Sequence, residues 1–166
     1  MGKTRIIGID PGSRFTGYGI IDSDGQDIKL VDAGCIRLST QLFSERLKRL
    51  FDEISRICLE FQPHCAAVEQ VFYAQNVRSA LQLGQVRGVI LLGLISHHCK
   101  IFEYSALEMK NAITGYGRAE KAQVRKMVEL MFHTTFEDSK SDLTDALGLA
   151  ITHAHVSSFK SKLISL

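Results

Sequence analysis

Three short apolar runs near the N-terminus predict three β-strands in succession. The run from Thr4 to Asp10 is typical of a buried strand, and Tyr18 to Asp22 begins a second strand after a glycine-rich turn. Asp24-Gly25 is a strong hairpin signal ahead of a third strand from Ile28 to Leu38. Antiparallel strands therefore open the protein.

Helical spacing of apolar residues then alternates with two further strands. Ser44 can cap a first helix and Pro63 closes it. The apolar face of this helix is formed by Leu47, Leu50, Phe51, Ile54, Ile57, Cys58 and Phe61. Short strands are expected at 65–69 and 100–104, on either side of a helix over 76–97.

The C-terminal part of the chain is expected to be helical. Ser105 and Glu108 form a capping box for a third helix, which Gly115-Tyr116-Gly117 interrupts. Further helices are expected over 119–132 and 141–155, followed by a polar, frayed tail from Ser157.

This order of elements predicts an α/β fold with a mixed five-stranded sheet and helices on both faces. Early hairpins followed by alternating helices and strands are typical of that architecture. The 166 residues fit one domain, which we place at residues 1–156, with residues 157–166 as a C-terminal tail.

Composition indicates the class of protein and its cellular location but does not indicate an activity. Hydrophobic content of 45% and charged content of 23% are ordinary for a soluble protein, and no apolar stretch reaches the expected length of a membrane span. The four cysteines show no metal-binding spacing, so reduced thiols in a cytoplasmic protein are expected. A net charge of +2 permits nucleic-acid binding without requiring it.

Four carboxylates lie where a two-metal nuclease needs them. Asp10 and Glu69 each end a buried strand, and Asp142 and Asp145 lie three apart at the start of the last helix. Taken singly, each has an ordinary explanation as a turn former, a strand-end acid or an acid that complements a helix dipole. Together they can converge on one point, where two divalent ions would support phosphoryl transfer.

The motifs around these acids resemble those of the RuvC-type crossover junction endodeoxyribonucleases. The similarity covers Gly8-Ile9-Asp10-Pro11-Gly12, Glu69-Gln70-Val71-Phe72, Gly117-Arg118-Ala119-Glu120-Lys121 and Asp142-Leu143-Thr144-Asp145-Ala146-Leu147, in order along residues 4–156. The resemblance implies a ribonuclease H-like fold and a homodimer that resolves Holliday junctions in DNA recombination and repair. It also implies two Mg²⁺ ions per site, replaceable by Mn²⁺, on Asp10, Glu69, Asp142 and Asp145. A branch-migration complex of the RuvA and RuvB type is the implied partner.

Aromatic and basic residues supply the expected DNA contacts. Phe72 and Tyr73 follow the Glu69 strand, where an aromatic ring can stack on an unpaired base or simply staple the next helix. The resemblance favours Phe72 for stacking, and it assigns Lys110 and Lys121 to the DNA surface. Arg118 belongs to the same basic stretch, which could otherwise be an ordinary solvated face. Weaker candidates are Arg14, Arg78 and Arg87.

Two glycines on the second helix raise the question of a dimer. Gly84 and Gly88 lie four residues apart, which is compatible either with close packing on the sheet or with contact across a two-fold axis. The resemblance favours the dimer.

Three other function classes compete with a junction resolvase. A sugar kinase or ATPase with a similar phosphate loop needs a second lobe, for which 166 residues leave no room. An enzyme that cuts RNA in hybrids could use the same four acids, so only the Phe72 loop and the dimer helix discriminate against it. A junction-binding protein without nuclease activity is disfavoured, because clustered carboxylates repel one another without metal ions.

Overall fold

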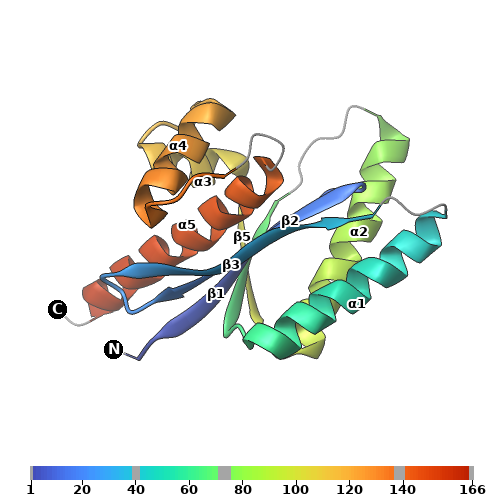
Figure 1. Ribbon diagram of the computed structural model, residues 1–166, viewed down its shortest axis with the longest axis horizontal. Helices are drawn as coiled ribbons and strands as arrows, with labels where there is room; N and C mark the ends of the chain where they lie inside the picture. Colours follow the sequence, from blue (N-terminus) through green and yellow to red (C-terminus); the bar gives the residue numbers. More distant parts are fainter. Residues whose placement is uncertain (1, 39–41, 71–75, 137–140, 165–166) are drawn as a thin grey trace.

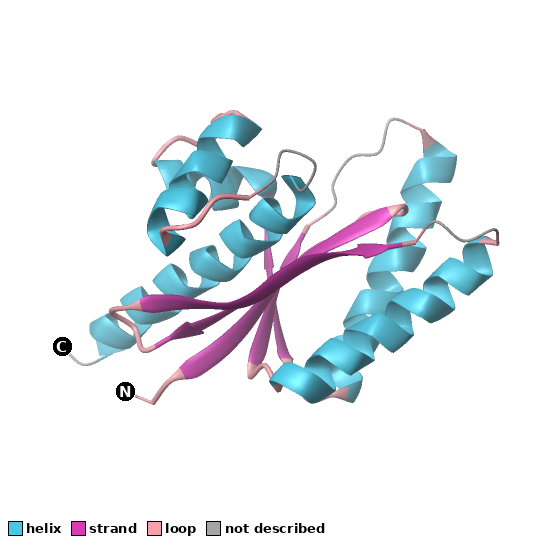
Figure 2. Cartoon of the chain, viewed as in Figure 1, coloured by secondary structure: helices cyan, strands magenta, loops and turns pink. Residues whose placement is uncertain are grey.

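The computed structural model describes residues 2–38, 42–70, 76–136 and 141–164, whose helices and strands are arranged around a twisted five-stranded sheet (Figures 1 and 2). The strands are β1 (Thr4–Asp10), β2 (Phe15–Ser23), β3 (Ile28–Arg37), β4 (Cys65–Glu69) and β5 (Lys100–Tyr104), in the spatial order β3-β2-β1-β4-β5. The pairs β1–β2 and β2–β3 are antiparallel, whereas β1–β4 and β4–β5 are parallel. The predicted mixed sheet is therefore confirmed.

Helices cover both faces of the sheet, as the sequence predicts. Helices α1 (Phe43–Phe61) and α2 (Val77–Ser96) lie on one face. On the other face α5 (Ser141–Ile164) lies against the sheet, and α3 (Ala106–Thr114) and α4 (Lys121–Phe132) pack on α5 (Figure 1). Each layer has its own apolar core, so the sheet is buried on both sides.

Capping explains most of the helix ends. The side chain of Asn76 accepts a hydrogen bond from the Ser79 amide at the start of α2, and the predicted capping box of Ser105 and Glu108 is present at α3. The prediction for Ser44 is wrong: α1 begins at Phe43 and has no side-chain cap. Phe43 and Leu47 both pack against the core, so apolar contact fixes this helix start.

The start of the second strand and the end of the last helix differ from their predicted positions. Strand β2 begins at Phe15, so Gly17 and Gly19 lie inside a strand and not in a turn. Helix α5 continues to Ile164, beyond its predicted end at His155, so the expected frayed tail is largely helical. The hydroxyl of Ser158 donates to the carbonyl of Gly25 (2.7 Å), which holds the polar end of the helix against the β2–β3 hairpin.

Helix α2 is the one element whose apolar surface is largely uncovered in the described part of the chain. Its 20 residues are long and apolar enough to cross a membrane by length and composition, contrary to the sequence-based expectation. One side of α2 nevertheless packs on α1, where Gly93 contacts Ile54, and Arg87 is bonded to the sheet. Its other side faces outward.

Candidate active site

The sheet brings Asp10 and Glu69 side by side. Strands β1 and β4 are parallel neighbours, and Ile9 pairs with Val68, so the two acids that follow them end adjacent strands. Adjacent strands lie about 4.8 Å apart, close enough for the two side chains to meet. The predicted convergence of the strand-end acids is therefore present in the fold.

Helix α5 carries Asp142 and Asp145 over the same end of the sheet. It lies unusually close, because a Cβ on Gly17 would fall 2.0 Å from the carbonyl oxygen of Asp142. A Cβ on Gly8 would likewise fall 1.9 Å from the carbonyl oxygen of Ala146. Only glycine permits this backbone contact, which sets the distance of the helix from the sheet. Sequence reasoning missed this role, although glycine inside a strand is a signal for close backbone approach.

Electrostatics show that the four acids form one cluster. Asp10 is partly buried, and burial raises its pKa to about 9, helped by a hydrogen bond with Glu69 and by the charges of Glu69, Asp145 and Asp142. A raised pKa of this size is expected where like charges meet in a poorly solvated site. Asp10 therefore holds a proton at neutral pH unless a cation replaces it.

Lys121 supplies a positive charge to the cluster. Its ammonium Nζ lies 3.1 Å from Oδ2 of Asp145. Partial burial opposes the charged form of Lys121, but attraction to Asp145, Asp10 and Asp142 outweighs it and raises the pKa of the lysine. The assignment of Lys121 to the DNA surface, which the family resemblance implies, is compatible with this position at the start of α4.

The four carboxylates have the oxygen donors that a divalent metal site needs, but their side chains are not positioned for coordination. Among the described residues, no three Asp, Glu, His or Cys side chains are placed to coordinate a common metal ion. The proton that the raised pKa favours on Asp10 and the ammonium of Lys121 instead reduce the negative charge. Oxygen donors at this density suit Mg²⁺ or Mn²⁺, which would displace that proton.

Arg87 stabilises the end of the strand that carries Glu69. Its guanidinium donates to the carbonyl of Glu69 (2.9 Å) and pairs with Glu103 on β5. It ties α2 to the end of β4, so its role in the fold is structural and it is a poor candidate for DNA contact.

The other predicted DNA contacts are placed only in part. Phe72 and Tyr73 lie outside the described residues. Lys110 is a partly exposed residue of α3, and Arg118 is exposed in the link that leads to Lys121. Of the basic residues on this side, Lys121 is the one for which the described residues show a contact with the carboxylate cluster.

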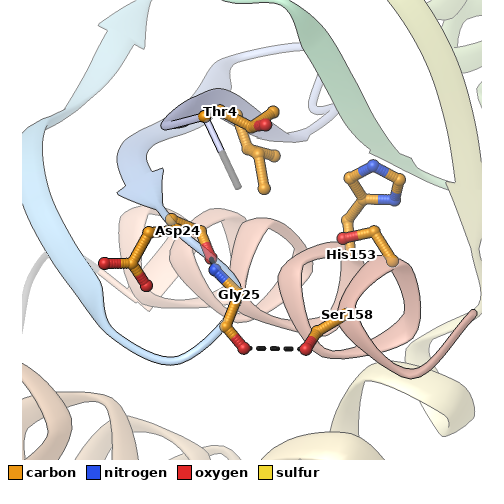
Figure 3. A pocket seen from close by; sticks show the side chains of 9 residues that line it. Thr4, Asp24, Gly25, His153 and Ser158 are labelled. Atoms are coloured by element: carbon orange, nitrogen blue, oxygen red, sulfur yellow. Dashed lines mark hydrogen bonds between the residues drawn. The ribbon is translucent and has the colours of Figure 1, made fainter. Parts of the chain in front are cut away.

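A separate hollow of about 280 Å³ lies at the opposite end of β1 (Figure 3). Thr4, Asp24, Gly25, His153 and Ser158 contribute to its lining. His153 is otherwise engaged, because its Nδ1 lies 2.8 Å from the Tyr104 hydroxyl and its ring stacks on Phe102. Asp10 ends the strand that Thr4 begins, so this hollow is not part of the carboxylate site.

Comparison with known proteins decides the family. The family model of the crossover junction endodeoxyribonuclease RuvC matches residues 6–153, a span that includes all four acids. The chain belongs to the RuvC family. The sugar kinase or ATPase alternative is rejected, because the nuclease family model matches nearly the whole chain.

RuvC relatives match along almost their full lengths. RuvC of Acinetobacter baumannii is 51% identical over 158 residues, which are 95% of this chain and 87% of the relative. RuvC of Edwardsiella ictaluri is 44% identical over 152 residues, 92% of this chain and 87% of the relative.

Solved structures agree with the sequence comparison. Thermus thermophilus RuvC in complex with a Holliday junction substrate superposes with a TM-score of 0.88 at 26% identity, covering 95% of this chain and 97% of that one. The yeast mitochondrial Holliday junction resolvase Ydc2 shares the fold, with a TM-score of 0.70 at 13% identity and coverage of 95% of this chain and 82% of that one. The predicted ribonuclease H-like fold of the RuvC family is confirmed.

Proposed function

We propose that this RuvC-family protein resolves Holliday junctions by metal-dependent hydrolysis of two symmetric phosphodiester bonds. The observation that carries the proposal is the mutual influence of Asp10, Glu69, Asp142 and Asp145 at one end of the sheet. A carboxyl whose pKa is raised to about 9, by burial first and by neighbouring carboxylates second, is poorly suited to a purely structural role. The four clustered carboxylates are well suited to holding divalent cations against a phosphate.

The four acids would hold two Mg²⁺ ions, for which Mn²⁺ can substitute. Bound ions of this kind supply an activated water and stabilise the leaving oxygen. Asp10 must lose its proton for this arrangement, whereas Lys121 can turn from Asp145 towards a phosphate oxygen without changing charge. Lys121 is thus a substrate-positioning residue in this proposal.

DNA would be held by aromatic and basic groups around the cluster. We assign base stacking at the opened junction centre to Phe72, assisted by Tyr73, and phosphate contacts to Lys110, Arg118 and Lys121. Stacking on an aromatic ring contributes about 1–3 kcal/mol per base. This contribution discriminates a junction, whose bases can unstack, from a closed duplex.

A homodimer would place two such sites on one junction. Helix α2 presents an outward stripe at helical spacing, formed by Val77, Leu81, Gly84, Gly88, Leu92 and Ile95, all of which are exposed. A Cβ at Gly84 or Gly88 would meet nothing within 4 Å, so these glycines do not serve packing against the described residues. A second copy of α2 fits such a stripe closely.

Cellular context follows from the same proposal. A cytoplasmic protein that acts on recombination and repair intermediates would work with a branch-migration complex of the RuvA and RuvB type. If a dimer buries the outward stripe of α2, the apolar character of this helix is explained without a membrane.

The test compares labelled four-way junctions with linear duplexes and RNA–DNA hybrids, with Mg²⁺ and with EDTA. We expect junction cleavage with Mg²⁺ only, and its loss in Asp10→Asn, Glu69→Gln, Asp142→Asn and Asp145→Asn while junction binding persists. Junction binding without cleavage at any metal concentration would indicate a binding protein. Preferential cutting of the hybrid would indicate a ribonuclease.

Phe72→Ala separates a resolvase from a general nuclease. Single-turnover junction cleavage should fall by about tenfold or more, the kinetic equivalent of about 1–3 kcal/mol. Phe72→Trp should retain most of the rate, and thermal unfolding of both variants should match the wild type. A wild-type rate in Phe72→Ala would remove stacking from the proposal.

A further inference from the structure

A groove runs along the open edge of β3, between that strand and α1. Its volume is about 380 Å³. The strand side is lined by Tyr18, Gly34, Cys35, Ile36 and Arg37, and the helix side by Arg49, Glu53 and Arg56. Strand β3 is the outermost strand of the sheet, so the groove is open along its length.

The groove carries guanidinium groups without ion-pair partners. Arg56 is neutralised by Glu53 (3.1 Å) and Glu60 (2.6 Å). Arg37 and Arg49 are exposed, and neither forms an ion pair with any residue in the described ranges. The groove therefore has an excess of positive charge that the fold itself does not use.

A third arginine extends this charge towards the strand ends. Arg14 is exposed, forms no ion pair with any described residue, and follows the turn after Asp10. Its carbonyl accepts a hydrogen bond from the Leu38 amide (2.8 Å), which places it beside the end of β3 where Arg37 lies. Arg14, Arg37 and Arg49, here called the edge arginines, thus come from three separate segments.

One strand row connects the groove with the first acid of the cluster. Asp10, Gly17 and Cys35 form one cross-strand row, since Asp10 pairs with Gly17 and Gly17 with Cys35. Two strand spacings amount to about 10 Å, comparable to the span of one or two nucleotides. Cys35, the β3 member of this row, also lines the groove.

We propose that the edge arginines bind the phosphate backbone of one junction arm as it leaves the carboxylate cluster. The inference rests on the proposed function and adds a second surface that contacts DNA. Lys121 pairs with Asp145 at the start of α4, whereas Arg37 and Arg49 line the groove on the β3–α1 side. DNA would cross the strand ends between these two groups of basic residues. Its scissile phosphate would then lie over the four acids. Guanidinium groups suit phosphate oxygens because they can bind two at once.

The experiment measures junction binding by the wild type and by Arg37→Gln/Arg49→Gln in EDTA over a range of salt concentrations. A matched control is Lys29→Gln/Lys100→Gln, which removes two exposed charges from the opposite ends of β3 and β5. The arginine variant should bind at least about fivefold more weakly, and its log Kd against log salt should be flatter by about one to two units. The control should keep the wild-type slope.

Arm length provides a second measurement on the same proteins. Shortening all four arms should weaken wild-type binding by a larger factor than binding by the arginine variant, which has already lost the outer contact. Equal salt slopes and equal arm-length dependence in both proteins would overturn the inference, and the edge arginines would then serve only to prevent edge-to-edge pairing of β3. A slope change in a protein that binds junctions but does not cut them would support the groove and refute the proposed nuclease activity.

Discussion

Asp10 is the residue whose chemistry depends most on its surroundings. Its folded-state pKa of about 9 lies above the ordinary value of 3.8, so the folded protein keeps a proton that the unfolded chain loses. In EDTA, the contribution of Asp10 to stability should therefore be lost as pH rises from about 4 to about 9. Thermal unfolding of the wild type and Asp10→Asn over this range measures the effect.

Metal ions should reverse this trend. Added Mg²⁺ should raise the wild-type melting temperature more at high pH than at low pH, because it competes with the proton for Asp10. Asp10→Asn should show a flatter pH profile and a smaller Mg²⁺ response. Identical profiles for the two proteins would contradict the assignment of Asp10 to the cluster.

Asp22 responds to pH in the opposite direction. It is buried, and its hydrogen bonds with Arg5 (2.8 and 3.0 Å), supported by Lys3 (2.7 Å), lower its pKa to about 2. Its stabilisation is complete above pH 3.8 and is lost as pH falls towards about 2. Asp22→Asn should reduce the free energy of unfolding at neutral pH by about 1–3 kcal/mol. Denaturant unfolding at about pH 7 and about pH 2.5 tests this, since the difference between the two proteins should shrink in acid.

The site residues differ in how far the sequence could reveal them. Asp10 and Glu69 end recognisable apolar strands, so their place at strand ends could be predicted from periodicity, whereas the pairing of those strands is a property of the fold. The ion pair of Lys121 with Asp145 depends on how α4 packs on α5, which no local pattern encodes. Arg37 and Arg49 are distant in sequence and ordinary in local context, so only the fold brings them to one groove.

At the scale of elements, the contact of α5 with β2 controls the site. Gly17→Ala would force a methyl group against the Asp142 carbonyl, so the helix must shift or the strand must distort. We expect a loss of about 1–3 kcal/mol of stability, typical of overpacking, with cleavage reduced further. Gly2→Ala is the control, because a Cβ at Gly2 meets nothing within 4 Å and Gly2 lies outside the proposed dimer stripe. Equal denaturation midpoints for the two variants would contradict the contact.

Element boundaries were predicted well where capping decides them and poorly where packing does. Ser105 and Glu108 encode the start of α3 locally, and the structure agrees. Ser44 has the right side chain for a cap, but the core contacts of Phe43 and Leu47 override it. The extension of α5 depends on the bond from Ser158 to Gly25, which joins residues far apart in sequence.

For the whole molecule, the exposed stripe on α2 predicts a dimer that can be broken selectively. Leu81→Lys should convert a particle of twice 18.5 kDa into one of 18.5 kDa, because a buried unpaired charge is strongly unfavourable. Leu130→Lys on α4 is the control, since the two leucines are similarly exposed at 65% and 58%. Light scattering with size exclusion gives the mass. A monomeric wild type, or a dimer that survives Leu81→Lys, would remove α2 from the interface.

The contact between α5 and the sheet also has a genetic consequence. Every missense change at the codons for Gly8 or Gly17 introduces a side chain, and the first carbon of any side chain already overlaps a backbone oxygen of α5. These two positions therefore have no mild alleles, whereas a carboxylate such as Glu69 has an isosteric amide that preserves the fold. A random-mutation screen for loss of resolution should recover two populations from one small region: poorly accumulating protein from the glycine codons and abundant inactive protein from the acidic ones.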